Sequence, residues 1–590
     1  MSRSAAIDAV TLDDLHRLAP WDPNHHLYAL VDMGSNGIRF SISDLSPPRA
    51  RLMRCLYRER AAISLFDALH HDADDADHDS FPAATVALVA RTVARFHRIA
   101  VADYGVAPAN FDVFATEAMR RAANAAAMVD ALRAAVPSLR MHVLAPEVET
   151  LFGAVGARSA FLDPHGLFLD LGGGSVQMTY MDSREEPAGS SAAAGPLGFE
   201  VAAARAGQSL PFGAARLSRI LQSADSHVQA AETASLRSGM RGAFDALCAR
   251  FPSLAAAEDI DVYLCGGGFR GYGAMLMHTD AIQPYPLAAL GSYTVAGAAF
   301  AQTARLRALN ASHAGKVFDM SRRRRAQFPA IATVVEALLA AVPRIRSATF
   351  CAGGNREGAL LMKLPRAVRE ENPLDLMGGR PQPDEGEGET RVRQAVLETL
   401  RSALPADAGA SITVFSLRLG GLLAGLIWRR AGERDEANAS TALHDACARD
   451  PSGPGLTHLA RAVLAVALCV RWGAALAPAD RALYRGLRAV AARADPAAVF
   501  WAEYVGAAAA AVAMVVPAWP RAAERLHRSI RFRARAEPGS KKLKIVLQVF
   551  VEEESAAGIE TEDLAARFRH VGREHEGKKI SVSVLPMSEY

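Results

Sequence analysis

The sequence of 590 residues contains few cysteines, and none of them stands at a spacing typical of metal ligands or of a disulfide framework. The six cysteines lie at positions 55, 248, 265, 351, 447 and 469, without a CxxC pair and without a histidine at ligand spacing. This scatter argues against a structural zinc site and indicates a reducing compartment.

Long hydrophobic runs are scarce as well. Residues 456–476 are interrupted by His458, Arg461 and Arg471, and residues 505–516 reach only about half of the ~20 residues that a membrane-spanning helix needs. The N-terminal segment carries acids and proline early and has no apolar stretch, so it does not resemble a secretory signal. We therefore expect a soluble, cytoplasmic protein.

Charge of neither sign is in excess. Lys and Arg total 66, and Asp and Glu total 63, which leaves a formal net charge of +3. This balance argues against a surface that binds nucleic acid or membrane as a whole, so we expect no DNA partner and no membrane partner. The contents of 50% hydrophobic and 22% charged residues are typical of a globular protein and exclude a mostly disordered or collagen-like chain.

The pattern of apolar residues divides the chain into regions of different architecture. After an N-terminal extension, residues 1–26, short apolar runs that end in glycine alternate with helical patterns from about residue 27 to 365, which predicts an α/β fold. Residues 372–390 are rich in Pro, Gly and acids and predict a linker. Residues 391–520 predict an all-helical domain, and residues 521–590 predict a small α+β domain.

Two segments of the α/β region share one plan, in which an apolar strand ends at an aspartate, turns through small residues and returns as a second strand. In the first, Asp32 precedes Gly34-Ser35-Asn36, and in the second, Asp170 precedes Gly172-Gly173-Gly174-Ser175. Each pattern predicts a β-hairpin. Glycine lets backbone N–H groups approach a phosphate, and the neighbouring carboxylate can hold a divalent metal. Two facing turns of this kind would form a phosphate clamp, and the alternative is a pair of ordinary tight hairpins.

Two further glycine-rich segments follow predicted strands. Residues 262–273 contain a literal GxGxxG, but the stretch that begins at His278 is not the strand ending in an acid that a dinucleotide-binding fold has about 20 residues on. A dinucleotide site is therefore not predicted. Residues 348–358 run from a strand through Gly353 and Gly354 into a helix and fit a loop that closes over a ligand cleft.

Taken in order, the segments VDMGSNGIRF, FATEAMRRAAN, APEVETLFGAVGA, LDLGGGSVQM, GPLGFE, CGGGFRGYG and GGNREG resemble the Ppx/GppA family of exopolyphosphatases and guanosine-pentaphosphate phosphohydrolases. The resemblance covers about residues 27–365. It implies two actin-like, ribonuclease H-like lobes, residues 27–150 and 151–371, with the active site between them. The helical extension and residues 321–331, SRRRRAQFPAI, resemble the fungal retrograde-regulation branch of this family.

The resemblance also implies roles for individual residues. The catalytic glutamate of the family, a general base for water, falls on Glu149, with Glu147 as the competing position. The family's arginine after a Thr-x-x-x segment falls on Arg120, which would act in catalysis by clamping phosphates that are not transferred, as Arg39 would also do. Asp170, helped by Asp32, would hold Mg²⁺. The implied phosphate-binding positions are Gly34, Ser35, Asn36, Arg39, Gly172, Gly173, Gly174, Ser175, Gly267 and Gly268.

The function implied is Mg²⁺-dependent hydrolysis of phosphoanhydride bonds in inorganic polyphosphate or (p)ppGpp-type nucleotides. One departure stands against it, because the bacterial enzymes have Thr-Glu after the glycine turn and this chain has Val176-Gln177, whose amide supplies no charge. The first alternative is therefore a regulatory protein that binds polyphosphate or nucleotide and signals to protein partners through its C-terminal domains. The second is a small-molecule kinase of the same superfamily. A homodimer is left open.

Three charged clusters are compatible either with binding or with ordinary exposure to solvent. The four consecutive arginines at 322–325 suit a polyanionic chain, although at most two of them can face one ligand from a helix; a solvated helix start is the alternative. The Asp/His run at residues 67–79 is expected to be a solvated loop. His444-Asp445 is expected to be structural, because no further ligand set surrounds it.

Overall fold

The computed structural model describes residues 9–18, 20–70, 79–183, 198–378, 387–406, 412–449, 453–537 and 543–590. Contacts within the chain divide it into two compact units. The first unit consists of Met1–Asp280 and Ala289–Glu371, and the second of Ala281–Ala288 and Asn372–Tyr590. The segments with the glycine turns all fall within the first unit.

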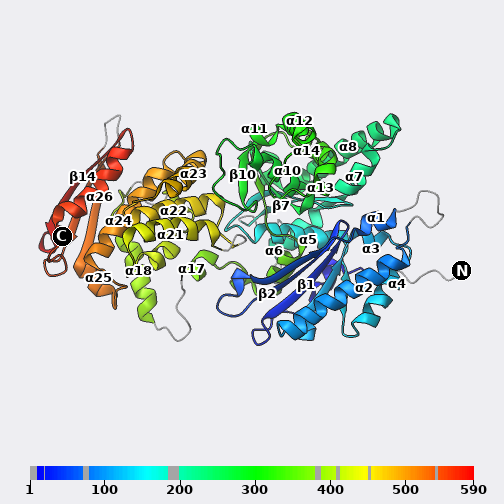
Figure 1. Cartoon of the computed structure of the whole chain (residues 1–590), viewed down its shortest axis with the longest axis horizontal. Coiled ribbons are helices and arrows are strands. Elements are labelled where there is room, and N and C mark those ends of the chain that lie inside the picture. The colour runs from blue at the N-terminus through cyan, green and yellow to red at the C-terminus, as the bar shows by residue number, and fades with distance from the viewer. Residues whose placement is uncertain are drawn as a thin grey trace. The chain divides into compact units, whose positions relative to one another are not determined.

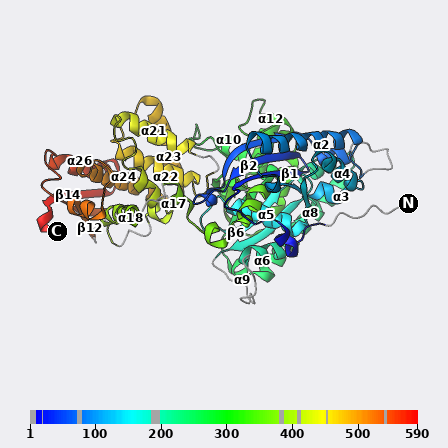
Figure 2. The same ribbon diagram turned by 90° about the horizontal axis from the view of Figure 1, so that it is seen from below.

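The N-terminal lobe of the first unit contains a five-stranded sheet with the order β3-β2-β1-β4-β5. Its strands β1 and β2 are labelled in Figures 1 and 2. β1, β2 and β3 are antiparallel neighbours, whereas β4 is parallel to β1 and β5 is parallel to β4. Alternation in β2 directs Ile38, Phe40 and Ile42 into the core, where they meet the apolar side of the helices. The strands are β1 (Leu27–Gly34), β2 (Gly37–Asp44), β3 (Arg54–Ala61), β4 (Phe111–Ala115) and β5 (Arg140–Val143).

The second lobe repeats this arrangement in a six-stranded sheet with the order β10-β11-β9-β6-β7-β8. β6, β7 and β8 are antiparallel neighbours, β9 is parallel to β6, and β11 is parallel to β9. Two lobes of the same topology are the actin-like architecture, so the expected fold class is confirmed. The strands are β6 (His165–Leu171), β7 (Val176–Asp182), β8 (Gln208–Leu210), β9 (Ile260–Cys265), β10 (Tyr293–Ala296) and β11 (Ile345–Phe350).

Helices surround both sheets, and the long ones show the apolar spacing that places one side in the core. In α2, for example, Val89, Val93 and Phe96 recur at helical spacing and are fully buried. The helices of the first unit are α1 (Leu65–Leu69), α2 (Ala83–Arg98), α3 (Glu117–Arg121), α4 (Ala125–Ala135), α5 (Pro146–Arg158), α6 (Gly198–Ala206), α7 (Ala214–Leu221), α8 (Ser226–Arg250), α9 (Pro252–Ala256), α10 (Gly266–His278), α11 (Gly297–Phe300), α12 (Thr303–Ser312), α13 (Arg322–Ala326), α14 (Phe328–Ala341), α15 (Asn355–Lys363) and α16 (Arg366–Arg369).

Helices α5 and α15 approach each other closely, and their first turns both lie at the cleft between the lobes. The approach depends on glycine. A methyl group on Gly156 of α5 would collide with the carbonyl group of Gly354, and one on Gly358 of α15 would collide with the carbonyl group of Phe152. This contact places the beginning of α5, with Glu149, beside the beginning of α15.

Two predicted boundaries differ from the structure in detail. The N-terminal extension is partly built into the first lobe, because Val10 bridges Leu144 beside the sheet and Leu12 is buried in a core cluster. The predicted linker, residues 372–390, contains α17 (Pro373–Met377) and the beginning of α18 (Glu387–Ser402), while residues 379–386 lie outside the described residues. A helix of five residues, such as α17, spans little more than one turn and so leaves little periodic signal in a sequence.

The second unit consists of helices followed by a three-stranded sheet, as the sequence predicts. α24 packs against α22 and α26, and α26 also packs on the sheet, whose order is β12-β13-β14. Its elements, after α17 and α18, are α19 (Thr413–Ser416), α20 (Gly420–Leu426), α21 (Asp435–Ala448), α22 (His458–Arg471), α23 (Pro478–Ala494), α24 (Ala498–Val515), α25 (Ala523–Ser529), β12 (Ile530–Glu537), β13 (Leu543–Val551), α26 (Thr561–Glu574) and β14 (Lys578–Pro586).

One helix of the described chain, α24, is long and apolar enough by length and composition to cross a membrane. It is longer than the run of residues 505–516 suggested, because the apolar pattern begins at Ala498. Most of the helix is buried within the second unit, and its single charged residue, Glu503, accepts a hydrogen bond from Tyr484 and contacts His575 at 2.7 Å. These features are typical of a core helix.

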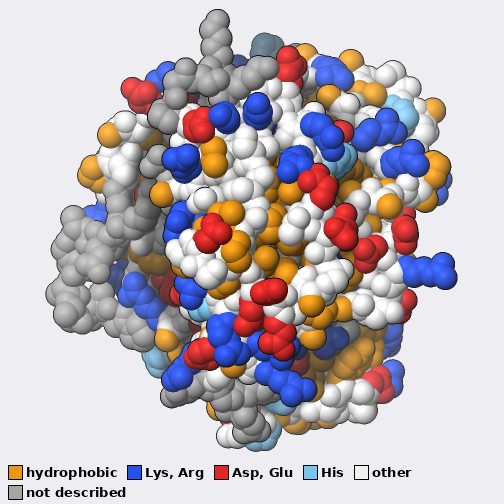
Figure 3. All heavy atoms as spheres, turned by 90° about the vertical axis from the view of Figure 1, so that its left-hand side faces the viewer, with side chains coloured by type: hydrophobic (Ala, Val, Ile, Leu, Met, Phe, Trp, Pro, Cys, Tyr) orange, Lys and Arg blue, Asp and Glu red, His pale blue; other side chains and the backbone are white. Residues whose placement is uncertain are grey.

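On the face seen in Figure 3, Lys and Arg side chains are interspersed with Asp and Glu and do not gather into one basic area.

Candidate functional site

Both predicted glycine turns are β-hairpins. In the first, Gly34 pairs with Gly37 across Ser35 and Asn36, and in the second, the N–H group of Gly172 donates to the carbonyl oxygen of Ser175. The two aspartates occupy matching places, because Asp32 pairs with Arg39 and Asp170 pairs with Gln177 in the two ladders. The plan that the sequence repeats is therefore also repeated in space, once in each lobe.

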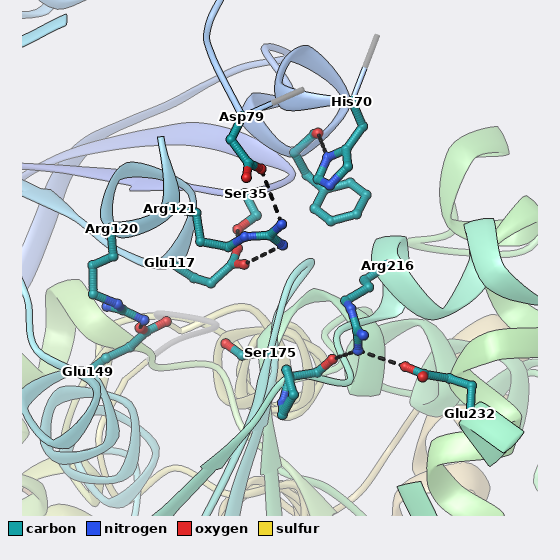
Figure 4. Close-up of polar contacts among 12 residues, drawn as sticks. Ser35, His70, Asp79, Glu117, Arg120, Arg121, Glu149, Ser175, Arg216 and Glu232 are labelled. Atoms are coloured by element: carbon teal, nitrogen blue, oxygen red, sulfur yellow. Dashed lines mark hydrogen bonds and ion pairs between the residues drawn. The ribbon is translucent and has the colours of Figure 1, made fainter. Parts of the chain in front are cut away.

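The two turns lie against each other. A methyl group on Gly173 would lie 3.0 Å from Cβ of Ser35 and 2.9 Å from Nδ2, the side-chain amide nitrogen, of Asn36. Ser35 donates to the carboxylate of Glu117 at 3.2 Å, and that carboxylate in turn contacts Gly174 of the opposite lobe. Figure 4 shows Ser35 and Ser175 on opposite sides of the cleft, with the Arg120–Glu149 pair beside them.

A cavity of about 410 Å³ opens at this contact and is lined by residues of both lobes. All of the predicted phosphate and metal positions line it, together with Glu149. They are Asp32, Gly34, Ser35, Asn36, Arg39, Glu149, Asp170, Gly172, Gly173, Gly174, Ser175, Gly267 and Gly268. Of the predicted site residues, Arg120 alone does not line the cavity among the described residues.

The backbone of the second turn is oriented by α7. The carbonyl oxygens of Gly172 and Gly173 accept from the N–H groups of Ala214 and Ala215, each at 2.9 Å, and that of Gly174 accepts from Gly213 at 3.0 Å. Because a trans peptide directs its N–H group opposite to its carbonyl group, the N–H groups of residues 173–175 point away from α7. The turn therefore presents donors on its other side, as a phosphate-binding loop must.

Two aspartates lie at the cavity wall. Asp32 is buried, and its Oδ1 has no hydrogen-bond partner among the described residues. Burial raises the pKa of Asp32 above its usual value, against the effect of Arg39, whose Nη1 lies 3.9 Å from Oδ2. Burial also raises the pKa of Asp170, and Asp32 adds to that rise. Two buried acids at one cavity, of which Asp32 raises the pKa of Asp170, favour a bound cation.

The donor set fits Mg²⁺. Among the described residues, no three His, Cys, Asp or Glu side chains form a cluster that would hold a metal by themselves. Mg²⁺ usually takes one or two carboxylates and completes its coordination with water and substrate phosphate. The carboxylates of Asp32 and Asp170 match this requirement. Oδ1 of Asp32 has no hydrogen-bond partner among the described residues.

Glu149 lies in the first turn of α5 and forms an ion pair with Arg120. Nη2 of Arg120 donates to Oε2 of Glu149 at 2.9 Å, and its Nη1 donates to the carbonyl oxygen of Leu144. Burial raises the pKa of Glu149 to about 7, although Arg120 opposes the rise. One helical turn on, a methyl group on Gly153 would lie 3.2 Å from Oδ2 of Asp170, so α5 runs beside the second turn's aspartate.

This geometry distinguishes Glu149 from its competitor. Glu149 lines the cavity, whereas Glu147 does not. It also changes the place of Arg120, which was predicted among the catalytic residues beside the phosphates. Arg120 donates to the carboxylate of Glu149 and does not line the cavity, so the role expected of it becomes that of a positioning residue.

The raised pKa predicts a stability effect of Glu149→Gln. A carboxyl group whose pKa is higher in the folded than in the unfolded state destabilises the fold once the pH exceeds its pKa in the unfolded chain. For Glu149 this loss of stability is complete above pH 7 and amounts to ~3 kcal/mol. Glutamine is neutral and still accepts from Arg120. We expect Glu149→Gln to raise the Tm by roughly 2–5 °C at pH 8 in metal-free protein and to leave it unchanged at pH 4.5.

Glu147→Gln is the matched control for this measurement, because it removes the same charge from the same helix outside the cavity. It should show no pH-dependent difference in Tm. Equal Tm values for wild type and Glu149→Gln at pH 8 would contradict the raised pKa of a buried carboxylate at position 149.

The literal GxGxxG segment joins β9 to α10 in the wall of the cavity. α10 begins at Gly266, directly after β9, and a side chain there would collide with Asp170 and with the carbonyl group of Leu171. Gly268 packs against the side chain of Leu171 in the same way. These glycines let α10 approach β6, and no strand follows α10 before β10, which is antiparallel to its neighbour. The structure thus agrees that this is not a dinucleotide-binding fold.

Sequence reasoning missed a set of charged and polar residues that also line the cavity. They are Arg58, Arg60, Thr116, Arg270, Asp319, Arg356 and Glu357, with Asn355 at the start of α15. The segment GGNREG signalled three of them, but Arg58 and Arg60 alternate with Glu59 on β3 as in any exposed strand. Of the four arginines at 322–325, only Arg323 and Arg324 line the cavity, so the limit of two is confirmed.

Gln177 does not line the cavity. Its side chain is buried, and Nε2 donates to Oγ of Ser175 at 2.7 Å and to Oγ of Ser209 at 3.2 Å. The amide therefore supports the second turn by a neutral hydrogen bond. Of the other clusters, His444 pairs with Asp480 at 2.8 Å on the surface of the second unit, and residues 71–78 of the Asp/His run lie outside the described residues.

Comparisons with known proteins give consistent matches. A sequence model of the Ppx/GppA phosphatase family matches residues 46–367, and one of the RTG2 C-terminal domain matches residues 387–583. Retrograde regulation protein 2 of Saccharomyces cerevisiae (strain ATCC 204508 / S288c) is 29% identical over 498 residues, which cover 82% of this chain and 80% of that protein.

Solved structures that match part of this chain include a Ppx–GppA enzyme of Aquifex aeolicus and an exopolyphosphatase of Cytophaga hutchinsonii. The first is 15% identical with a TM-score of 0.41 and covers 57% of this chain and 98% of its own. The second is 17% identical with a TM-score of 0.42 and covers 59% of this chain and 99% of its own.

Proposed function

Because the chain belongs to the Ppx/GppA phosphatase family, we propose that it hydrolyses the terminal phosphoanhydride bond of inorganic polyphosphate or of a guanosine polyphosphate. The C-terminal match and the yeast relative assign it to the retrograde-regulation branch of that family, so the resemblance stated from the motifs is confirmed. One observation carries the proposal. Two turns that each follow an aspartate, one from each lobe, meet at a single cavity. Glu149, whose pKa is raised by burial to about 7, lies in the wall of that cavity.

In the proposed reaction, water attacks the terminal phosphorus and gives a proton to Glu149, while the bridging oxygen leaves with the shortened chain. A general base works best when its pKa lies near the working pH, and burial gives Glu149 that property. Arg120 keeps the carboxylate oriented through its hydrogen bond to Oε2. The N–H groups of the second turn stabilise the negative charge that develops on the phosphate oxygens.

Mg²⁺, which Asp32 and Asp170 would hold, supplies further neutralisation of phosphate charge when it is bound. Arg39 lines the same cavity beside Asp32 and contributes positive charge from the chain itself. In this proposal, α5 carries the carboxylate that takes the proton from water, and the two turns carry the groups that bind phosphate.

The experiment that tests this function is an assay of orthophosphate release from polyphosphate, pppGpp and ATP with Mg²⁺. We expect release from polyphosphate or pppGpp that stops when EDTA removes the metal. If neither substrate loses phosphate under these conditions, the hydrolase assignment is wrong.

A second candidate is a regulatory protein that binds the same phosphate chain without turning it over. Gln177 supports it, because the resemblance expects a carboxylate at that place. Contacts between the lobes also favour it: Arg219 of α7 donates to the carbonyl oxygen of His70, and Arg323 of α13 donates to the side chain of Asn36. Arg323 and Asn36 line the cavity, so a ligand that enters it would compete for their contact and so change lobe closure. Tight binding without orthophosphate release is the result that separates this candidate from the hydrolase.

A further inference from the structure

We propose that the open edge of β14 is a self-association surface, through which two copies of this chain join their three-stranded sheets into one continuous sheet of six strands. The two β14 strands pair in antiparallel orientation, and the pairing is centred on Val582. The partner of this part of the second unit is thus a second copy of the chain. The surface is independent of the phosphate chemistry proposed for the first unit.

β14 is the last strand in the order β12-β13-β14, so it has a neighbouring strand on one side only. In Figure 1, β14 is labelled within the second unit beside α26. Its parallel pairing with β13 runs over the whole strand, from residue 578 to residue 586. Among the described residues, no backbone group outside β13 bonds to residues 579–586. A long unpaired edge of this kind is a template for a further strand.

The hydrogen-bonding groups of the open edge belong to alternate residues of β14. The carbonyl oxygen of Gly577 accepts from the N–H group of Leu543 on β13 at 2.9 Å. Because successive residues of a strand direct their backbone groups to opposite sides, the odd-numbered residues of β14 bond to β13 and the even-numbered residues face away. The N–H and C=O groups of Ile580, Val582 and Val584 are therefore directed to the open edge.

The same three residues carry apolar side chains on the face of the sheet against which α26 packs. On β13, Leu547 and Val549 are fully buried on this face. Their neighbours in register on β14, Val582 and Val584, are partly exposed, because the described chain has no strand beyond β14. A further strand at this edge would cover them, and burial of apolar surface stabilises an added strand.

Antiparallel pairing of β14 with a second β14 places compatible residues opposite each other. When the pairing is centred on Val582, Ile580 faces Val584 of the second copy and Val582 faces its own counterpart. These are the positions whose backbone groups point outward, so about six hydrogen bonds form, two for each hydrogen-bonded pair. Their β-branched side chains meet on one face, which is a favourable cross-strand combination.

The lysines at the beginning of β14 favour the antiparallel over the parallel arrangement. In the antiparallel register, Lys579 faces Leu585 of the second copy, and its aliphatic stem lies along that side chain. A parallel arrangement in register would place Lys579 opposite Lys579, and like charges directly opposite each other destabilise a sheet. The antiparallel pair is also closed by a two-fold axis, so association ends at two chains.

The other edge of the sheet, β12, is protected in a way that β14 is not. Arg531, Arg533 and Arg535 alternate along β12, and α18 and α25 pack against the strand. Charged side chains and covering elements are common protections of an edge strand. On β14 the charged residues stand only at the beginning, and residues 580–585 carry no charge. Of the two edges, that of β14 is therefore the one suited to pairing.

Sedimentation equilibrium of the whole protein in the micromolar range tests this surface, since it gives the mass of the particle and the Kd of a dimer. Val582→Pro is the test substitution. Proline is tolerated on an edge strand where the N–H group faces outward, so it removes this donor and leaves the pairing with β13 in place. Val582→Thr is the matched control, because it keeps the N–H group and the branched shape. Circular dichroism and Tm confirm that each variant is folded.

We expect the unmodified chain to form a dimer and no larger species. Val582→Pro should raise the Kd of this dimer at least about tenfold, because the two hydrogen bonds at the centre of the pairing are lost. Val582→Thr should keep the Kd within about threefold of the unmodified chain, since threonine loses only part of the apolar contact.

Two double variants test the register. In the proposed pairing, Ser581 faces Ser583 of the second copy, on the face of the sheet opposite to α26. Ser581→Glu combined with Ser583→Glu sets like charges against each other and should raise the Kd at least about fivefold. Ser581→Glu combined with Ser583→Lys sets opposite charges against each other and should keep the Kd within about threefold of the unmodified chain.

Three results overturn the surface. A chain that stays monomeric throughout the concentration range has no such interface, and its edge is then free for a strand of another protein. A dimer that Val582→Pro does not weaken is held by a different surface. An equal loss in the two double variants shows that the strands do not meet in the antiparallel register. None of these results bears on phosphate release.

Discussion

Replacing Glu149 by glutamine is expected to lower the rate of orthophosphate release from polyphosphate by about 10²–10⁴-fold, the range that a general base contributes. Glutamine has nearly the same shape and still accepts the hydrogen bond from Arg120, but it cannot take a proton from water. Binding of polyphosphate should therefore remain within about threefold of wild type. The measurement is steady-state release beside equilibrium binding of the same substrate.

Glu147→Gln is the control for this prediction. It lies two residues earlier, on the same helix, loses the same charge and does not line the cavity. Its release rate should match wild type within twofold. Full activity of Glu149→Gln would reject the assignment of the base, and full activity of that variant together with a loss in Glu147→Gln would exchange the two roles.

Asp170→Asn is expected to cause the second large loss, a fall in release of at least about 100-fold together with a higher Mg²⁺ requirement. Substitutions of groups that merely orient metal ligands cost about 10–100-fold, so loss of a ligand should cost at least as much. A readout without turnover is also available. Mg²⁺ that binds only the folded protein raises Tm, and this rise should disappear in Asp170→Asn.

Asp319→Asn separates loss of a ligand from loss of charge in the cavity. Asp319 lines the same cavity and forms an ion pair with Arg270 at 3.0 Å. Its replacement should leave the Mg²⁺ dependence of Tm and of release unchanged. If Asp170→Asn keeps the wild-type Mg²⁺ dependence, or if Asp319→Asn loses it, the metal does not bind at the aspartate of the second turn.

The features that the sequence predicted well are those encoded locally. A strand, an aspartate, a short turn and a second strand are contiguous, so the hairpins that carry Asp32 and Asp170 follow from alternation and turn chemistry alone. Two lobes were implied by the family resemblance, and each of them carries one copy of this plan, 138 residues apart (170 − 32). Contact between the turns could be expected but not measured from the sequence.

The features that the sequence did not reveal depend on pairing between distant segments. Arg60 reaches the cavity because β3 lies beside β2, and Arg324 reaches it because α13 packs near α10, which are facts of tertiary structure. Arg120 was placed at the phosphates because motif order cannot tell which side of a glutamate its partner occupies. The hydrogen bond between Arg120 and Glu149 decides that question.

Gln177 illustrates a further limit of reasoning by substitution. Its neutral amide suggested a weakened metal or water site, yet the side chain is turned to the hydroxyl groups of Ser175 and Ser209. The effect of this residue on turnover is therefore indirect, through the position of the second turn. The same geometry is compatible with a turn that binds phosphate firmly, which both the hydrolase and the regulatory candidate require.

The central claim is that both turns hold one phosphate chain, and hydrogen–deuterium exchange tests it most directly. Glu149→Gln protein is compared with and without tripolyphosphate and Mg²⁺, and peptides that contain residues 33–38 and 171–176 are followed separately. The account predicts that both peptides become protected together and with the same dependence on ligand concentration. Protection of one turn alone, or of neither while the ligand is demonstrably bound, would contradict it.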